Sequence, residues 1–186
     1  STRYTKALAR SMAQTKQVKA VNILDNAFTA GSFAGGDGVA LCANNHPTIA
    51  GTFSNVLATA SDLSETSLEQ AVIDIAKFTD ERGLKIAARG QKLIIHPAQQ
   101  FIAERIMKSA NRVGTADNDI NALSSMGMIP QGYVVNNFLA DGESFFIKTD
   151  VPNGLKHMVR APIKTAMEGD FETGNVRYKA RERYSF

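Results

Sequence analysis

The sequence has one cysteine, three histidines and no long apolar run, and each scarcity limits what the chain can be. Cys42 has no second cysteine with which to form an internal disulfide, which fits folding in a reducing compartment. No apolar run approaches the roughly 18 residues that a membrane-spanning helix needs, and the N-terminus lacks the hydrophobic core of a signal peptide. We therefore expect a cytosolic protein with no membrane partner.

Calcium-binding and hydrolase motifs are also missing or incomplete. Asp117, Asp119 and Asn121 copy the first half of a calcium loop. Ala122 and Met128 then stand where that loop needs a glycine and a bidentate acid, so calcium binding is not predicted. The chain contains no G-x-S-x-G elbow to present a serine nucleophile.

The remaining candidates for chemistry are isolated. The glycine-rich stretch GSFAGGDG at residues 31–38 lacks the Lys-Ser/Thr ending of a phosphate loop and follows a helix. His46, His96 and His157 lie in unrelated contexts, and none has a second ligand at helical spacing. Cys42 has no identifiable base to activate it. We expect no catalytic, cofactor-binding or metal-ligating residue, which favours a structural protein over an enzyme.

The composition is that of a soluble globular chain with an uneven charge distribution. With 186 residues, 44% hydrophobic and 21% charged, it can form one domain or two lobes. The net charge is only +3, but five cations precede the first acid, Asp25: Arg3, Lys6, Arg10, Lys16 and Lys19. This segment is either a surface for nucleic acid or an acidic partner, or the solvated face of a helix that pairs with a neighbouring subunit. Only Tyr4 lies among these cations, and this scarcity of aromatic residues favours the second interpretation.

Three helices are predicted from apolar spacing and end signals. Residues 1–30 contain no glycine or proline, and their apolar residues recur every three or four positions until the glycines begin. These apolar positions are Leu8, Met12, Thr15, Val18, Val21, Leu24 and Phe28. A second helix is expected to begin at a capping box over residues 66–69 and to stop at Gly83. A third is predicted over residues 98–110, with Phe101, Ile102, Ala103 and Ile106 facing inward.

The rest of the chain favours strands and loops, which together with the helices predicts an α+β fold. Strands are predicted over residues 39–43, 92–96, 133–137, 144–148 and 155–160. Residues 44–61 are expected to be a loop with little regular structure, and residues 111–132 a long loop of the kind that usually contacts something. Four aromatic residues near the predicted strands favour core packing over base stacking: Tyr133, Phe138, Phe145 and Phe146.

Residues 175–186 predict a strand with two chemically different faces. Val176, Tyr178, Ala180, Tyr184 and Phe186 alternate with Arg177, Lys179, Arg181 and Arg183. Glu182 falls among the apolar positions, where we expect it to pair with a neighbouring cation. An edge strand of this kind recruits other chains unless it is covered, so we expect more of the same polypeptide, or another subunit, to cover it.

Two blocks of the sequence resemble a known family. They are GTADNDINAL at residues 114–123 and GDFETGNVRYKARERYSF at residues 169–186, and they accompany a basic helix that runs into GGDG. Together they resemble the major capsid protein of tailed bacteriophages, a family with the Hong Kong 97-type shell fold. The order of the segments agrees over essentially the whole chain.

The resemblance implies an assignment for each segment. Residues 1–62 would form the peripheral domain with a spine helix over residues 1–30, residues 63–170 the axial domain, and residues 171–186 a strand that returns to the peripheral sheet. The loop at residues 111–132 would lie near the fivefold and sixfold axes. The extended arm and hairpin loop that precede the spine helix in the family are not present, which suggests the ordered core of a larger subunit. Because family cross-links use a lysine on that hairpin, no cross-linking residue is assigned.

The function implied is that of a non-enzymatic virion subunit. It would self-assemble into pentamers and hexamers that enclose double-stranded DNA, with copies of itself, a scaffolding protein and packaged DNA as partners, and with assembly in the host cytoplasm. Two alternatives remain. One is a DNA-binding module that uses the basic N-terminal helix, with steeply salt-dependent binding. The other is a small α/β enzyme that uses Cys42 or a histidine.

Overall fold

A computed structural model describes residues 2–31, 33–112, 119–169, 172 and 174–186. The chain combines helices with small sheets, which confirms the predicted α+β class. Its internal contacts divide it into two units. They are the helix–hairpin unit, residues 1–23 with 153–186, and the mixed unit, residues 24–152.

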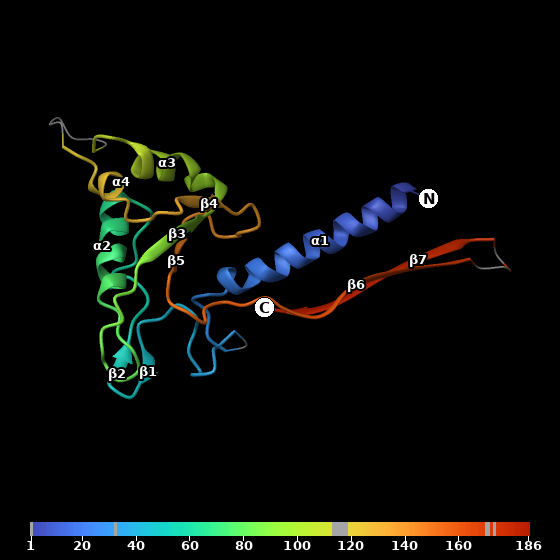
Figure 1. Cartoon of the computed structure of the whole chain (residues 1–186), viewed down its shortest axis with the longest axis horizontal. Helices are drawn as coiled ribbons and strands as arrows, with labels where there is room; N and C mark the ends of the chain where they lie inside the picture. Colours follow the sequence, from blue (N-terminus) through green and yellow to red (C-terminus); the bar gives the residue numbers. More distant parts are fainter. Residues whose placement is uncertain (1, 32, 113–118, 170–171, 173) are drawn as a thin grey trace. The chain divides into compact units, whose positions relative to one another are not determined.

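A three-stranded sheet ordered β4-β3-β5 lies at the centre of the mixed unit (Figure 1). Strand β3 (Gly90–Ile95) pairs in parallel with β4 (Tyr133–Val135) and antiparallel with β5 (Phe145–Thr149). Leu93 and Ile95 are fully buried, because alternate side chains of a strand point to the same face. The three strands predicted in this region are confirmed, with small differences at their ends.

Helices pack against this sheet and complete the core. They are α2 (Glu65–Ala76), the 3₁₀ turn η1 (Pro97–Gln99), α3 (Gln100–Lys108) and α4 (Ala122–Met126). The core cluster consists of Leu63, Leu68, Leu93, Ile95, Ala103, Ile106, Leu123 and Ile129. It draws on every part of the mixed unit from α2 onward, so this unit has the hydrophobic interior of an independent body.

The capping box of α2 lies two residues before the predicted one at residues 66–69. Ser64 is the N-cap, and its hydroxyl accepts a hydrogen bond from the Ser67 amide at 3.1 Å, while the Ser64 amide donates to the Ser67 hydroxyl at 2.9 Å. Leu63 and Leu68 flank the cap and are both buried in the core cluster. They occupy the positions of a hydrophobic staple, which fixes where the chain enters the helix.

Two short strands lie where the sequence predicted an irregular loop. β1 (His46–Thr48) and β2 (Gly51–Phe53) form an antiparallel hairpin joined by a two-residue turn. The prediction over residues 44–61 was wrong here because Pro47 and Gly51, which are usual in loops, are part of this small ladder.

The strand predicted over residues 39–43 is not formed. The Asn55 side chain takes up the backbone groups that a strand would use, accepting from the Ala43 amide at 2.8 Å and donating to the Leu41 carbonyl at 2.7 Å. The segment therefore satisfies its polar groups through a side chain and bends instead of pairing.

Helix α2 ends at Ala76, before the predicted stop at Gly83. Phe78, which lies within the range predicted for this helix, instead packs edge-on against Phe53 of β2, with ring centroids 4.9 Å apart. Gly83 lies in the turn that follows, with φ of +84°. The aromatic contact with β2 stabilises this segment more than further helical turns would. Gly83 adopts the positive φ that the turn requires.

Helix α3 buries a narrower face than the sequence predicted over residues 98–110. Ala103 and Ile106 are buried as expected, but Phe101 is 72% and Ile102 41% exposed. Successive residues of a helix are rotated by about 100°, so only the stripe through Ala103 and Ile106 meets the sheet. The inward placement predicted for Phe101 and Ile102 was wrong.

Helix α1 (Thr2–Asp25) ends before Ala30, where its end was predicted. The Asp25 carboxylate accepts a hydrogen bond from the Ala140 amide at 2.9 Å, far along the chain. Ala27 is then fully buried. These tertiary contacts turn the backbone away from the helical path, although neither glycine nor proline is present.

The hairpin of β6 (Met158–Gly169) and β7 (Val176–Ser185) is a long two-stranded ribbon (Figure 1). β7 confirms the strand predicted over residues 175–186. β6 begins within the predicted run at residues 155–160 but continues well beyond it. Proline usually interrupts strands, and the register shifts on either side of Ala161 accommodate Pro162 in β6.

Candidate interaction surface

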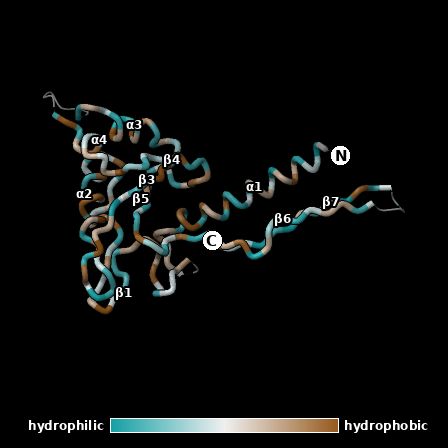
Figure 2. Tube along the Cα trace, viewed as in Figure 1, coloured by the Kyte–Doolittle hydropathy of each residue, from teal (hydrophilic) through white to brown (hydrophobic). Residues whose placement is uncertain are grey.

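Strand β7 has the two faces that its sequence predicted. Its alternating half-buried residues are Tyr178, Ala180, Glu182 and Tyr184, and Phe186 follows in the same pattern. The exposed residues between them are Arg177, Lys179, Arg181 and Arg183. Figure 2 shows that hydrophilic and hydrophobic residues both recur along the ribbon. The alternation therefore separates two surfaces along its whole length.

Cross-strand register extends each face onto β6, because directly opposed residues point the same way. Tyr184 opposes Val159, Tyr178 opposes Met167, and Arg181 opposes Lys164. The apolar face of the hairpin is thus Val159, Met167, Val176, Tyr178 and Tyr184. The cationic face of the hairpin is Lys164, Arg177, Lys179, Arg181 and Arg183, and it also carries Glu168, which opposes Arg177.

Helix α1 contacts the apolar face near Tyr184. Lys16 Nζ lies 2.7 Å from Glu182 Oε2 and 5.1 Å from the centre of the Tyr184 ring. The Glu182 side chain is only 11% exposed, so its charge is balanced by Lys16 where water is scarce. The prediction that Glu182 pairs with a cation is confirmed.

The same contact changes the apolar stripe predicted for α1. Leu8 and Met12 are half-buried as expected, and Lys16 occupies the next position of the stripe. Val18, predicted in the stripe, is 48% exposed. The prediction failed at Val18 because an ion pair from another part of the chain decides which face of the helix turns inward.

An aromatic cluster lies at one end of the ribbon. The His157 and Phe186 rings stack with centroids 4.7 Å apart, and Tyr184 meets Phe186 edge-on at 5.3 Å. Such pairs add a stabilisation of about 0.5–1.5 kcal/mol to simple burial. They hold this end of the ribbon together without enclosing it in a core.

Within its described residues, the helix–hairpin unit buries one hydrophobic side chain, Val21. On the apolar face of the hairpin, Met167 is 68%, Val159 58% and Val176 52% exposed. A two-stranded ribbon is at best marginally stable in water, and apolar side chains left exposed on one face can mark an interaction site. This face is therefore the candidate site of protein–protein contact.

Cys42, considered as a nucleophile, lies in a poor environment for that role. The thiol is half-buried, and its burial raises the pKa to about 11. Reactive cysteines have lowered pKa values and positive surroundings. At neutral pH this side chain is an inert thiol.

The reactivity of Cys42 is directly testable. We expect iodoacetamide at pH 8 to alkylate Cys42 of the folded chain about tenfold to a hundredfold more slowly than Cys42 of the urea-unfolded chain, because little thiolate is present. Mass spectrometry gives both rates, and the folded rate should still rise above pH 9. Equal folded and unfolded rates at pH 8 would contradict the protected thiol.

The glycine-rich stretch holds a carboxylate, not an anion site. Asp37 Oδ2 lies 2.7 Å from His46 Nδ1, and Asp37 Oδ1 accepts a hydrogen bond from the Val39 amide. The hydrogen bond with His46 and that from Val39 hold the pKa of the Asp37 carboxyl below its ordinary value. The negative charge of Asp37, fixed within the turn, repels phosphate. Its contact with His46 connects the glycine-rich stretch to β1.

The other histidines and the calcium-like run have structural partners. His96 Nδ1 accepts a hydrogen bond from the Ala98 amide and caps η1. Asn121 caps α4, while Asp117 lies outside the described residues. Among residues that the structure describes, no three His, Cys, Asp or Glu side chains gather as a metal site. No helix of the described chain is both long and apolar enough to cross a membrane.

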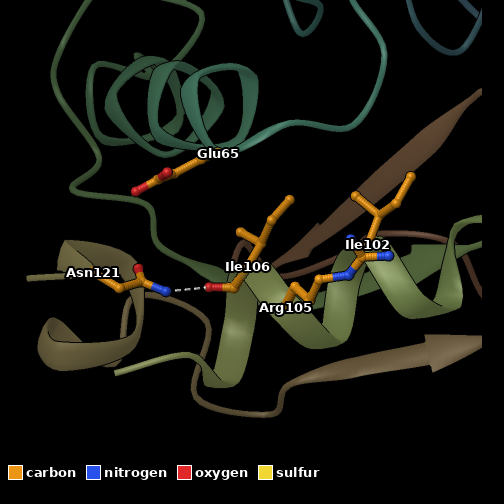
Figure 3. A pocket seen from close by; sticks show the side chains of 5 residues that line it. All are labelled: Glu65, Ile102, Arg105, Ile106 and Asn121. Carbon is orange, nitrogen blue, oxygen red and sulfur yellow. Dashed lines mark hydrogen bonds between the residues drawn. The ribbon is translucent and has the colours of Figure 1, made fainter. Parts of the chain in front are cut away.

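A small cavity lies beside α3 (Figure 3). Its volume is about 160 Å³, and Glu65, Ile102, Arg105, Ile106 and Asn121 line it. Pockets for substrates and cofactors usually have about 300–1,000 Å³. The Asn121 amide already donates to the Ile106 carbonyl at 2.6 Å, as Figure 3 shows. The cavity is therefore a small gap in packing.

Three of the four aromatic residues predicted for the core do pack. Tyr133 and Phe145 lie against the core cluster, and Phe146 stacks on Phe28 with centroids 5.9 Å apart. Phe138 is 40% exposed, so its predicted core position was wrong. The Tyr133 hydroxyl also donates to Glu104 at 2.8 Å.

Comparison with known families identifies the class. A family model described as phage capsid protein matches residues 2–186, nearly the whole chain. The chain belongs to this phage capsid protein family and is a structural protein of the bacteriophage virion. The family is structural, which fits the expectation of a protein that is not an enzyme. No curated protein and no solved structure matches the chain.

Proposed function

We propose that the chain is the major capsid protein of a tailed bacteriophage, with the Hong Kong 97-type shell fold. It self-assembles into pentamers and hexamers that form an icosahedral shell around double-stranded DNA. The apolar face of the hairpin carries this proposal. In a chain of the phage capsid family, an apolar face that the chain itself leaves exposed is most simply covered by a neighbouring subunit.

Many modest contacts, repeated by symmetry, would stabilise the shell. In the part of the chain that the structure describes, the β6–β7 sheet has two strands, so each strand has one edge without a neighbouring strand. Free edges pair with other chains, and closed symmetry repeats each contact around a ring. Phe101, 72% exposed on α3, adds a second apolar contact point on the mixed unit.

The domain assignment is part of the proposal. Residues 1–62 and 171–186 would form the peripheral domain, with its spine helix within residues 1–30, and residues 63–170 the axial domain. This assignment follows the resemblance to the family, and it is distinct from the two contact-based units. The partners would be copies of the chain, a scaffolding protein in the host cytoplasm, and packaged DNA.

Electron microscopy of the chain expressed with its natural assembly partners tests the proposal. We expect closed shells of uniform diameter. Met167→Asp should raise the protein concentration needed for assembly at least tenfold, because it places a charge where a methionine would be buried between subunits.

Ala166→Asp is the matched control. It adds the same charge one residue away, on the cationic side of the ribbon opposite Lys179. Shells should form normally from this variant. Failure of the wild-type chain to assemble with its partners would refute the proposed function, and equal assembly of the two variants would remove the apolar face from the contact.

A further inference from the structure

We infer that the cationic face of the hairpin binds the phosphate backbone of double-stranded DNA, without regard to base sequence. The inference rests on the proposed function, because it identifies the surface through which the shell meets its contents. Helix α1 contacts the opposite face, at Glu182 and Tyr184. The cationic face is thus left exposed to solvent.

The cations form a regular line. Arg177, Lys179, Arg181 and Arg183 occupy alternate positions of β7, so they recur about every 6.8 Å and extend over about 20 Å. Lys164 widens the line onto β6, where it lies directly opposite Arg181. A linear array of this kind suits a polyanion whose charges are also arranged in a line.

Four cations of this face are not balanced by an ion pair within the described chain, while Arg177 lies opposite Glu168. Like charges that lie directly opposite one another destabilise a sheet. Lys164 and Arg181 are such a pair. In the part of the chain that the structure describes, neither residue forms an ion pair, and neither do Lys179 and Arg183. A bound anion would relieve this repulsion, so the arrangement is better suited to the bound state than to the free one.

Charge is also divided unevenly between the two units. The helix–hairpin unit has twelve Lys and Arg against four Asp and Glu, a formal charge of +8. The mixed unit has nine against fourteen, a formal charge of −5. The net charge of +3 therefore conceals one strongly basic unit, in which seven of the twelve cations lie within residues 153–186.

A second copy of the chain is a weaker partner for this face, because most acids of the mixed unit are already engaged. Carboxylates accept hydrogen bonds from backbone amides or lie near cationic side chains at Asp25, Asp37, Glu65, Asp74, Asp80, Glu104, Asp141 and Asp150. Three of the five cations are arginines, whose planar fork suits phosphate oxygens. No aromatic residue lies among them to stack on bases, which gives binding that ignores sequence.

Binding of a fluorescent mixed-sequence DNA duplex to the 186-residue chain, measured against salt, tests the inference. Because Lys164, Lys179, Arg181 and Arg183 would each contact one phosphate, we expect log K to fall with log salt at a slope of about −4. The triple variant Lys179→Gln, Arg181→Gln, Arg183→Gln should lose at least tenfold in affinity at low salt and reduce the slope by about 3. Arg177 stays unchanged because it has a further interaction within the chain.

The control is Arg3→Gln, Lys6→Gln, Arg10→Gln, which removes the same charge from α1 and should bind DNA like the wild type. Circular dichroism establishes that both variants are folded. Equal losses in the two variants, or a loss in the α1 variant alone, would overturn the inference. Binding of polyglutamate is the second test. If polyglutamate binds with the same affinity as DNA, and loses as much affinity in the hairpin variant, the inference is overturned, because the partner would then be an acidic polypeptide.

Electron microscopy separates this inference from the proposed function. If the wild-type chain forms shells but its hairpin face does not bind DNA, only the inference is refuted. Hairpin-dependent DNA binding by a chain that never assembles would refute only the proposed function.

Discussion

Replacing Leu93 by alanine is expected to lower the free energy of unfolding by about 2–5 kcal/mol. Leu93 is 0% exposed on the central strand of the β4-β3-β5 sheet, opposite Tyr133 and Ile147. Strands on both sides prevent the surroundings from collapsing into the space that the side chain leaves. Since small domains have only about 5–15 kcal/mol of stability in total, this loss is large.

Urea unfolding followed by far-ultraviolet circular dichroism measures the change. Leu84→Ala is the matched control, because Leu84 is 65% exposed and its replacement should change the free energy by no more than about 0.5 kcal/mol. If Leu93→Ala does not fold, Leu93→Met keeps the volume and should cost less than about 1.5 kcal/mol. Equal unfolding midpoints for the two alanine variants would show that the assigned core is wrong.

The core strand that holds Leu93 was predictable because its signals are local. A short apolar run bounded by polar residues is enough to indicate a buried strand. The two faces of β7 were predictable for the same reason, since strict alternation is visible within ten residues. Both elements depend mainly on residues next to one another in the chain.

The errors fall where distant contacts decide the structure. Helix α1 ends at Asp25 because its carboxylate binds the Ala140 amide, 115 residues away. The half-buried position of Lys16 depends on Glu182, near the other end of the chain. Neither partner can be read from the spacing of residues within the helix.

The candidate surface was only partly visible in the sequence. The cations of β7 could be counted, but the preceding strand was predicted only over residues 155–160, so the position of Lys164 opposite Arg181 was not foreseen. The register shows that Met167 and Val159 continue the apolar face. A regular alternation of apolar and polar residues along β6 would have indicated this apolar face from the sequence. The bulges in β6 interrupt that alternation.

Replacing Asn121 by alanine is expected to lower the free energy of unfolding by about 2–4 kcal/mol, through two separate losses. The side chain is 2% exposed and donates to the Ile106 carbonyl at 2.6 Å, and its oxygen accepts from the Ser124 amide at 3.3 Å. Alanine leaves the carbonyl at the end of α3 without this donor and α4 without its cap. Urea unfolding measures the loss.

Asn137→Ala removes the same side chain from an exposed position and should change the free energy of unfolding by no more than about 0.5 kcal/mol. Asn121→Asp separates the two roles, because a carboxylate can still cap α4 but cannot donate to the Ile106 carbonyl unless it is protonated. Burial against a carbonyl oxygen should raise the pKa of that aspartate above its unfolded value. Compared with the wild type at the same pH, the variant should therefore be least destabilised at low pH and lose stability as the pH rises through the folded-state pKa of the new aspartate. An Asn121→Asp variant whose unfolding midpoint tracks the wild type at every pH would show that the bond to Ile106 contributes nothing, and that capping alone keeps Asn121 buried.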